Sequence, residues 1–232
     1  MKTSYIPKNK RKKILLLGDD LRMHSGVATM LREIVTKTSN HFNWIQLAGA
    51  INHPEQGKKF DLSQATRDQF GIEDADISLI PINGYGSPQL IRDMIKFEKP
   101  DVLMMMTDPR YYVWLFQIEN EVREHIPIIY LNIWDDYPAP LYNEDFYRSC
   151  DGFAAISKQT KNINRIVLGD DAKNKVIKYV PHGIDHNMFR PLTESDPDWS
   201  NFQSYKKQVF GDKEYDFVWY YNARNIRRKQ TS

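Results

Sequence analysis

Residues 180–191, which read VPHGIDHNMFRP, are the stretch around which the rest of the chain can be interpreted. They follow the apolar run VIKYV at residues 176–180, whose β-branched and aromatic residues are typical of a short strand. Pro181 ends that strand because it has no backbone donor, and Gly183 allows a sharp turn. Such a turn at the carboxyl end of a strand can line a ligand crevice in an open α/β sheet. On these residues alone, an ordinary turn into a linker is an open alternative.

Upstream of this stretch, apolar runs alternate with helical patterns. Continuous apolar runs favour buried parallel strands, which we predict at residues 14–17, 44–48, 77–82, 102–106, 128–132, 152–156 and 176–180. The segments between them predict helices at residues 26–35, 88–97, 111–124 and 157–168, and a polar excursion with a helical piece at 53–70. This alternation predicts an α/β fold with a doubly wound, Rossmann-like parallel sheet. A short helix at 202–210 and a new strand at 217–221 are expected near the end.

The composition is that of a soluble globular protein. The chain has 232 residues, of which 41% are hydrophobic and 27% are charged, with a net charge of +2. Because the charge is nearly balanced and basic residues cluster only at the two ends, a nucleic-acid partner has little support. The single cysteine, Cys150, cannot form an internal disulfide, which suits a reducing cytoplasm, the expected location.

Residues 1–12 form a basic arm, which we expect to be disordered or loosely attached before the first strand. Only four apolar residues, 14–17, follow the arm before Gly18, too few for a signal peptide or a membrane span. No transmembrane segment is expected. A weak peripheral contact with anionic lipids is an open alternative, because basic clusters are attracted to such surfaces.

Two loops have residues that suit a binding site. Ser25 and Gly26 open a helix directly after the first strand, a geometry that can bind an anion, and Ser25 can also cap the helix. No Gly-x-Gly-x-x-Gly is present, so this is not a dinucleotide fingerprint. Asp108 follows the fourth strand and can either face a cleft or start a helix.

The loop after the fifth strand places Trp134, Asp135 and Asp136 at a crevice position. Adjacent residues on an extended chain point in opposite directions, so the two carboxylates are not expected to act as a paired acid and base. The two carboxylates can orient a ligand hydroxyl or, as a weaker alternative, bind a metal, and a loop with a capping aspartate is also an open alternative. Ser157 is expected to cap the next helix, with a cleft-lining role as second choice.

Three motifs together resemble those of family 4 glycosyltransferases, which have the two-domain GT-B fold. VPHGID followed by FRP resembles that family's Asn-Gly-Val/Ile-Asp…Phe-x-Pro signature, with His182 where asparagine is commoner. SGV at residues 25–27 resembles its Gly-Gly-Val loop, with Ser25 for the first glycine. ARNIRRKQ at 223–230 resembles Gly-Arg-x-x-x-x-Lys-Gly, in which Arg224 and Lys229 keep the spacing while Ala223 and Gln230 replace the glycines.

The resemblance implies the N-terminal half of a GT-B fold. Residues 13–191 would be the acceptor-binding domain, 192–214 a linker with a short helix, and 215–232 the first strand and phosphate loop of an apparently truncated donor domain. It implies transfer of a sugar from a nucleotide-sugar donor to an unknown acceptor, with retention of configuration, and little activity for these residues alone. The nucleotide sugar is a substrate, and no cofactor or metal is expected.

The resemblance also implies roles for individual residues. Arg224 and Lys229 would neutralise the leaving diphosphate and, with Asp135, form the catalytic set. Ser25 and Gly26 would lie beside the donor phosphates. The acceptor cleft would include Asp108, Trp134, Asp135, Asp136, His182 and Gly183.

Two other classes were compared with this one. A non-enzymatic α/β module that keeps the fold to bind a ligand or partner is an open alternative. A response-regulator receiver is excluded because the third strand ends in Pro81-Ile82-Asn83, without the aspartate that a receiver phosphorylates.

Overall fold

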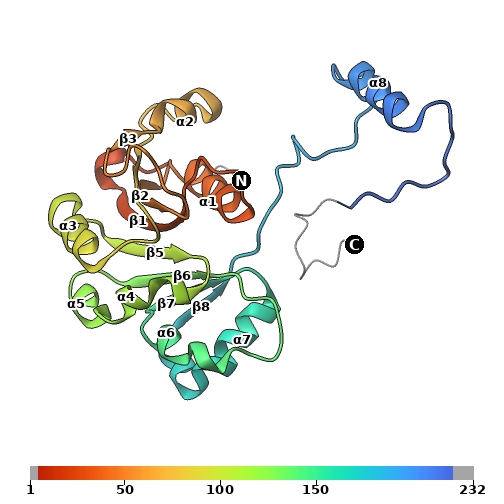
Figure 1. The fold of residues 1–232 in the computed structure, drawn as a ribbon. Helices are drawn as coiled ribbons and strands as arrows, with labels where there is room; N and C mark the ends of the chain where they lie inside the picture. Colours follow the sequence, from red (N-terminus) through yellow and green to blue (C-terminus); the bar gives the residue numbers. More distant parts are fainter. Residues whose placement is uncertain (1–4, 222–232) are drawn as a thin grey trace. The chain divides into compact units, whose positions relative to one another are not determined.

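The computed structural model describes residues 5–221 (Figure 1). The contacts within the chain divide it into two units, Met1–His182 and Gly183–Ser232. Among the described residues, the first unit contains the sheet and most of the helices, and the second contains the helix α8 (Trp199–Phe210) in an otherwise irregular segment.

The first unit is built on an eight-stranded sheet in the order β3-β4-β2-β1-β5-β6-β7-β8. All neighbouring strands are parallel except β3, which runs antiparallel to β4. The seven predicted strands are all present, and only the two-residue β3 was not foreseen. The bounds are β1 Lys12–Asp19, β2 Phe42–Gly49, β3 Phe60–Asp61, β4 Ile77–Pro81, β5 Val102–Met106, β6 Ile128–Asn132, β7 Gly152–Ala155 and β8 Val176–Tyr179.

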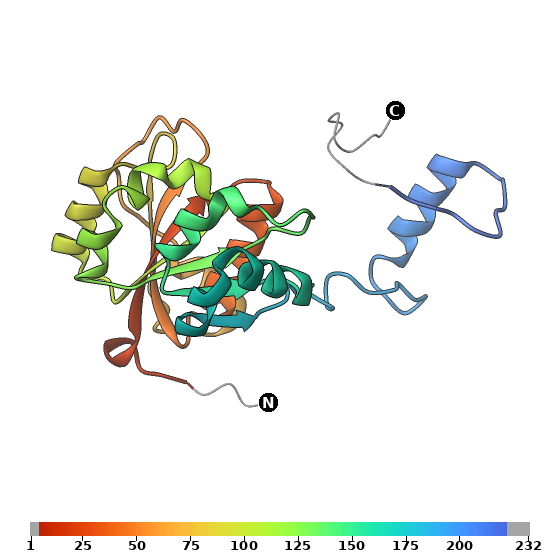
Figure 2. The ribbon, with the colours of Figure 1, turned by 90° about the horizontal axis from the view of Figure 1, so that it is seen from below.

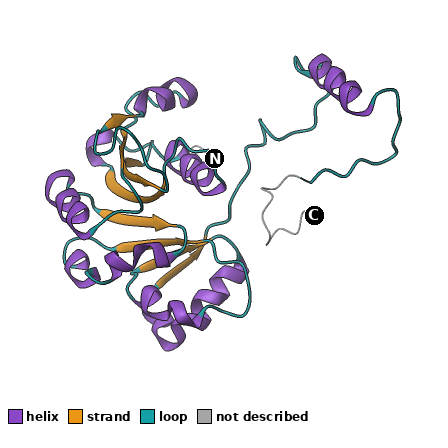
Figure 3. Ribbon diagram, in the orientation of Figure 1, coloured by secondary structure: helices purple, strands orange, loops and turns teal. Residues whose placement is uncertain are grey.

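Helices alternate with these strands along the chain (Figure 3). The α-helices are α1 Gly26–Lys37, α2 Ser63–Phe70, α3 Pro88–Glu98, α4 Val113–Phe116, α5 Glu119–Arg123, α6 Glu144–Arg148, α7 Lys158–Leu168 and α8 Trp199–Phe210. Four 3₁₀ turns are η1 Lys8–Lys10, η2 Pro109–Tyr112, η3 Leu141–Asn143 and η4 Gly169–Asn174. The single helix predicted for residues 111–124 is wrong, because that segment is divided into the end of η2, α4 and α5.

Both faces of the inner part of the sheet are packed, which is why strands such as β5 are continuously apolar, whereas the edge strand β8 is mostly exposed. Leu15 and Leu17 of β1 belong to one hydrophobic cluster, which includes buried residues of α3, α4, α5, α6 and α7. Ile14 and Leu16 point to the other face and pack in a second cluster with Leu31 of α1. In Figure 2, α3 lies on one side of the strands and α1 on the other. The fold is therefore the predicted doubly wound α/β sheet.

Cys150 lies in the first of these clusters and is fully buried. Its Sγ donates to the Phe146 carbonyl oxygen over 3.3 Å, and burial raises the pKa of the thiol well above its ordinary value. A neutral thiol is a poor nucleophile, so Cys150 packs as a small apolar residue.

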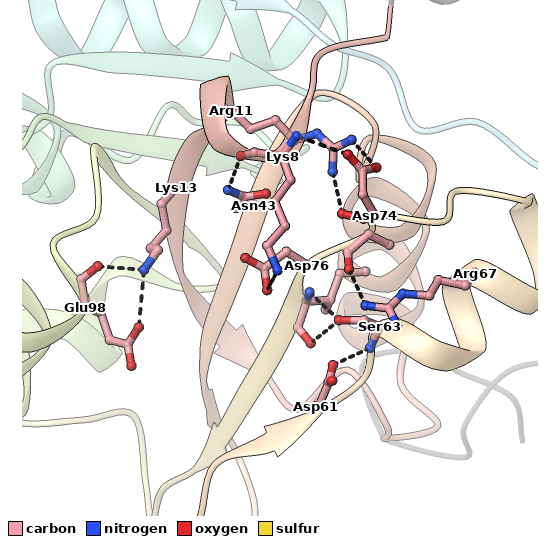
Figure 4. Close-up of polar contacts among 12 residues, drawn as sticks. Lys8, Arg11, Lys13, Asn43, Asp61, Ser63, Arg67, Asp74, Asp76 and Glu98 are labelled. Carbon is pink, nitrogen blue, oxygen red and sulfur yellow. Dashed lines mark hydrogen bonds and ion pairs between the residues drawn. The ribbon is translucent and has the colours of Figure 1, made fainter.

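The basic arm is attached to the sheet, so the expectation of a loose or disordered arm is wrong for residues 5–12. The Arg11 side chain is buried, and its guanidinium donates to the Asp74 carboxylate over 2.6 Å and to the Asp74 carbonyl over 2.9 Å (Figure 4). Lys8 pairs with Asp76, and Lys12 pairs with Asp101. These lysines and the arginine are therefore engaged within the domain.

We expect the Asp74→Asn variant to unfold with about 2 kcal/mol less free energy than wild type at neutral pH, because buried Arg11 loses its counter-charge. Burial alone would raise the pKa of the Asp74 carboxyl, but hydrogen bonds from Tyr5, Arg11 and the Lys8 amide lower it overall from 3.8. A lowered folded-state pKa means that the stabilisation is complete above pH 3.8 and is lost as the pH falls further.

Urea denaturation at pH 7 and pH 3 measures this effect. The deficit of Asp74→Asn against wild type should shrink at pH 3, because protonation removes the same contribution from wild type. The control is Asp76→Asn, whose exposed pair with Lys8 spans 3.4 Å and should contribute less than about 0.5 kcal/mol. A deficit that is equal at both pH values would contradict the assignment.

In the second unit, α8 has no buried residue. Residues 217–221 form no strand in the structure, contrary to the prediction, and no partner strand for them lies within the described residues. A lone strand has no ladder hydrogen bonds, which is the physical reason for the difference. The assignment of residues 215–232 to the start of a donor domain stays a prediction.

Candidate functional site

The order of the strands places a switch point between β1 and β5. From β1 the chain moves outward through β2 and β4, and it then returns to place β5 on the opposite side of β1. The loops after β1 and β5 therefore leave the sheet in different directions. In open α/β sheets, ligands bind at this position, outside the carboxyl ends of the strands.

The backbone at this edge holds two uncommon conformations. Thr107, directly after β5, has φ of 102°, and Ala50, directly after β2, has φ of 74°. Positive φ is costly for residues other than glycine, and more so for β-branched threonine. Strain of this kind concentrates at functional sites, where the surrounding structure must enforce it.

The carboxylate of Asp19, at the end of β1, is the centre of the polar contacts at the switch point. It is buried, with 8% of the residue exposed. Its Oδ2 accepts a hydrogen bond of 2.9 Å from the Ser25 hydroxyl, and its Oδ1 accepts one of 3.2 Å from the Tyr85 hydroxyl. The Gln46 amide donates to the Asp19 carbonyl over 2.8 Å. The Asp19 carboxylate thus joins the start of α1 to the loop after β4, since Tyr85 lies 66 positions away along the chain.

Tyr85 links this carboxylate to an exposed aromatic ring. Its ring stacks on Tyr111 with centroids 4.6 Å apart and meets the buried Tyr112 edge-on at 5.7 Å. Burial, and then the charge of Asp19, raise the pKa of Tyr85 well above 10.0. The phenol therefore stays protonated and donates. We call Asp19, Ser25, Tyr85, Thr107 and Tyr111 the switch-point cluster.

The turn after β5 is held by its own aspartate. Asp108 Oδ1 accepts from the Arg110 amide over 3.0 Å, and its carboxylate also pairs with the Arg110 guanidinium. The hydrogen bonds from Arg110 lower the pKa of Asp108. Of the two roles predicted for Asp108, the helix-start role is confirmed, since it caps η2.

The loop after β6 is held in place by the buried side-chain amide of Asn132. Asn132 is fully buried, and its Nδ2 donates to the Tyr147 hydroxyl over 2.7 Å and to Asn164 Oδ1 over 2.5 Å. Its Oδ1 accepts from the Trp134 amide over 2.9 Å. The Trp134 carbonyl in turn accepts from Thr160 Oγ1 over 2.8 Å. The loop is therefore anchored to both α6 and α7.

The two carboxylates of this loop lie on its surface. Asp135 and Asp136 are both exposed. The Asp135 carbonyl accepts from Gln159 over 2.9 Å, and Asp136 Oδ1 accepts from the Tyr137 amide over 2.8 Å. The carboxylate oxygens of Asp135 make no hydrogen bond or ion pair with any residue between 5 and 221. They are free to accept from a ligand.

Of the other predicted residues, the two serines cap helices, and the remaining three are exposed. Ser25 caps α1 by accepting from the Ala28 amide over 3.0 Å, and Ser157 caps α7 by accepting from Thr160 over 2.8 Å, so both predicted caps are confirmed. Gly26 is the exposed first residue of α1. His182 and Gly183 are exposed beyond the end of β8, on either side of the division between the two units.

Arg224 and Lys229, the predicted diphosphate-binding pair, lie outside the described residues. Their roles stay predictions.

Sequence reasoning missed Asp19, Tyr85 and Thr107 as site residues. Asp19 offered a usable signal, since an acidic residue directly after the first apolar strand lies at the carboxyl edge of the sheet. The sequence contains no such signal for Tyr85, because this residue lies in a polar loop and its contact with Asp19 joins positions 66 residues apart.

A hollow of ≈ 330 Å³ lies at the other, amino end of the strands, lined in part by Lys13, Asn43, Trp44, Lys59 and Glu98. Asn43 Oδ1 and Trp44 Nε1 are buried without a hydrogen-bond partner, but each exposes less than 1 Å². A ligand in the hollow could not reach these atoms. The ammonium of Lys13 is already bonded to the Glu98 carbonyl over 2.8 Å (Figure 4). We do not include this hollow in the site.

Between residues 5 and 221, no group of three or more His, Cys, Asp and Glu side chains is arranged to hold a metal ion. No helix in the same part of the chain is long and apolar enough to cross a membrane.

These observations define the chain as a doubly wound, Rossmann-like α/β protein with a polar and aromatic cluster at its switch point. No family model and no curated protein matches the sequence. Solved structures match its fold. The Anabaena Alr3699/HepE protein, solved in complex with UDP and glucose, is 15% identical with a TM-score of 0.51, and the match covers 86% of this chain and 50% of that one.

Two further structures are less similar. One is the E. coli trehalose-6-phosphate structure bound with UDP-2-fluoro glucose, with 10% identity, a TM-score of 0.48, and coverage of 84% of this chain and 54% of that one. The other is UGT71G1 of Medicago truncatula complexed with UDP-glucose, with 12% identity, a TM-score of 0.41, and coverage of 84% and 56%.

The resemblance to GT-B glycosyltransferases is thus confirmed at the level of the fold. The chain has the Rossmann-like α/β fold that makes up one half of a GT-B structure. It spans about half the length of the solved structures that it matches.

Proposed function

We propose that the first unit is the acceptor-binding half of a glycosyltransferase that moves a sugar, with retention, from a nucleotide-sugar donor to an acceptor hydroxyl. The observation that supports this most is the switch-point cluster around Asp19, because it lies where ligands bind in such sheets. The match to HepE, a protein solved with UDP and glucose, supports the same proposal.

In this proposal, the cluster orients the acceptor. The Asp19 carboxylate has lone pairs beyond those taken by Ser25 and Tyr85, and an acceptor hydroxyl can donate to one of them. Tyr85 stays protonated and holds that carboxylate in place. Asp135, with its free carboxylate, accepts from a second hydroxyl and remains our candidate for the catalytic carboxylate of this half. Asp108, Trp134, Asp136, His182 and Gly183 stay proposed as residues of the cleft.

The donor would be held mainly through its phosphates. Ser25 and Gly26 would lie beside them at the start of α1, where the helix dipole favours negative charge. Arg224 and Lys229 would neutralise the departing diphosphate, the Arg with a planar fork and the Lys as a point charge. Fixed charges that stabilise the charge developing in the transition state commonly contribute more to catalysis than any other single effect. We propose no cofactor or metal for this transfer.

The matching structures are about twice as long, so we propose that a second half supplies the contacts to the donor ribose and sugar. Residues 1–232 alone would then show little or no turnover.

Release of nucleoside diphosphate from UDP-, GDP- and ADP-sugars tests both the proposed sugar transfer and the proposed need for a second half. It would be measured for the longest polypeptide that the coding sequence gives and for residues 1–232 alone. We expect turnover with at least one donor for the former if it includes a donor-binding half. Sustained turnover by residues 1–232 would refute the division of labour. A longer protein with paired domains but no turnover would refute the transferase proposal.

We expect Arg224→Ala and Lys229→Ala each to weaken UDP binding about tenfold, since a hydrogen bond to a charged group contributes about 1.5 kcal/mol or more. Isothermal titration of UDP into the longest polypeptide measures the change. Lys206→Ala is the matched control, because Lys206 is an exposed lysine of α8 with no side-chain partner in the described part of the chain. Equal affinities for all three variants and wild type would remove Arg224 and Lys229 from the proposal.

A further inference from the structure

We infer that the acceptor is a neutral saccharide, which stacks on exposed aromatic rings at the carboxyl edge of the sheet and donates hydrogen bonds to the carboxylates beside them. The rings belong to Tyr111, Trp134, Tyr137 and Tyr142, which we call the aromatic rim. This inference rests on the proposed function, because it names the acceptor of that same site.

The first observation is the exposure of three tyrosines on neighbouring loops. Tyr111 is 55% exposed, Tyr137 is 49% exposed and Tyr142 is 65% exposed. Large aromatic side chains gain most from burial, so several exposed together mark an interaction surface.

The second observation is that two of these rings are held in place by other rings. One side of Tyr111 is stacked on Tyr85, at 4.6 Å and an interplanar angle of 25°, and Tyr85 is itself bonded to Asp19. The ring of Tyr142 meets Trp134 edge-on at 6.0 Å. The indole nitrogen of Trp134 donates to the Asp136 carbonyl over 2.9 Å. Rings fixed in this way lose little conformational entropy when a ligand covers their open sides.

The third observation is that the two parts of the rim lie side by side. Tyr111 follows β5 and Tyr142 follows β6, and these strands are adjacent, with Met106 opposite Leu131 at their carboxyl ends. Arg110 lies near the phenols of both Tyr111 and Tyr142. The pKa of Arg110 is raised mainly by Asp108, and both phenols add to that rise. The rim is therefore one surface that two loops share.

The charges on this surface favour a neutral ligand. The only described cation on the two loops, residues 107–112 and 133–143, is Arg110, and it is neutralised by Asp108. Asp135 and Asp136 add two exposed carboxylates, and neither forms an ion pair with a residue between 5 and 221. An anionic acceptor would meet repulsion, whereas hydroxyl groups can donate to these oxygens.

A saccharide matches both features at once. The C–H face of a sugar ring is apolar and slightly positive, so it suits the negative face of an aromatic ring. The equatorial hydroxyls project sideways from that face and reach acceptors at its margin. A purely apolar ligand would leave Asp135 and Asp136 desolvated and without partners, which is unfavourable.

Titration of defined trisaccharides, followed by NMR chemical shifts of residues 1–232, tests the inference without any donor. The neutral probes are maltotriose, cellotriose and triacetylchitotriose, and the anionic probe is trigalacturonate. We expect at least one neutral probe to bind at millimolar concentration or better, and at least fivefold more tightly than trigalacturonate. If no neutral probe binds, or trigalacturonate binds as tightly, the inference is overturned. The transferase proposal would stand, because nucleotide release tests it separately.

Substitutions show whether the rim is the binding surface. We expect Tyr111→Ala and Tyr142→Ala each to weaken binding of the neutral probe at least fivefold, and Tyr111→Phe to retain it. Phe97→Ala is the matched control, since Phe97 is 70% exposed on α3, away from the rim. The double variant with Asp135→Asn and Asp136→Asn should bind trigalacturonate more tightly, because it lacks the two repelling carboxylates. Unchanged affinities in the Tyr111→Ala and Tyr142→Ala variants would place the saccharide elsewhere and overturn the inference.

Discussion

Replacing Gly49 with alanine is expected to lower the free energy of unfolding by about 3 kcal/mol, at the upper end of ordinary overpacking costs. Gly49 is the buried last residue of β2. A Cβ atom there would lie 2.5 Å from the Gly84 carbonyl oxygen and 3.2 Å from Cδ1 of Tyr85. The first contact is with backbone, which cannot rotate away. The loop after β4 would have to move away from β2.

This movement should also disturb the switch-point cluster, because Tyr85 belongs to the displaced loop and bonds to Asp19. Urea denaturation gives the stability change, and trisaccharide binding reports on the cluster. Gly26→Ala is the matched control, since a Cβ at Gly26 meets nothing within 4 Å and its stability should change by less than about 0.5 kcal/mol. If Gly49→Ala unfolds at the wild-type urea concentration, the close approach of β2 and the loop is not present in solution.

The Asn132→Ala variant is expected to lose about 4 kcal/mol, since each buried polar group left without a partner costs about 1–3 kcal/mol. Asn132 makes hydrogen bonds to three groups, which are the Tyr147 hydroxyl, Asn164 Oδ1 and the Trp134 backbone amide. Without it, Asn164 Oδ1 and the Trp134 amide each lose the hydrogen bond that Asn132 makes, and the Tyr147 hydroxyl loses a donor. The loop that presents Trp134 should loosen as a result.

Asn162→Ala is the control for this second variant. Asn162 lies on α7 like Asn164, but it is exposed, and its hydrogen bond to the Tyr137 hydroxyl is 3.2 Å long at the surface. We expect its loss to change the free energy by less than about 0.5 kcal/mol. Urea denaturation of both variants, with Trp fluorescence as the signal, gives the comparison. Equal stabilities would mean that water replaces the amide of Asn132, and the account of a buried anchor would be wrong.

The inner strands could be predicted from the sequence because they are largely buried on both faces, whereas the mostly exposed β8 was indicated by its β-branched and aromatic residues. Runs such as residues 14–17 and 102–106 have no polar residue, so they allow little other structure of that length. The segment at 109–124 could not be predicted, because its aromatic residues suit a helix and its division depends on packing. Tyr112 has to turn inward to reach the Met106 carbonyl at 3.2 Å, while Tyr111 turns outward onto Tyr85.

Residues of the candidate site could be predicted from the sequence only where their role depends on neighbouring residues in the chain. The caps at Ser25 and Ser157 follow from residue type and position, since a hydroxyl before a helix satisfies a free amide. The bond between Asp19 and Tyr85 depends on strand order, which brings the loops after β1 and β4 to the same edge. No periodicity in the sequence indicates that order. The glycosyltransferase motifs indicated the fold correctly, although His182 and Gly183 lie where the first unit ends.

The inert state of the one cysteine makes this protein suitable for site-directed labelling. Since the Cys150 thiol is sealed in the core and held neutral, maleimide reagents should leave the wild-type chain unmodified. A single cysteine introduced by Phe97→Cys or Asp136→Cys would then be the one reactive position, without any need to remove Cys150. A fluorophore at residue 136 would report directly on occupancy beside the aromatic rim, with residue 97 as a silent reference.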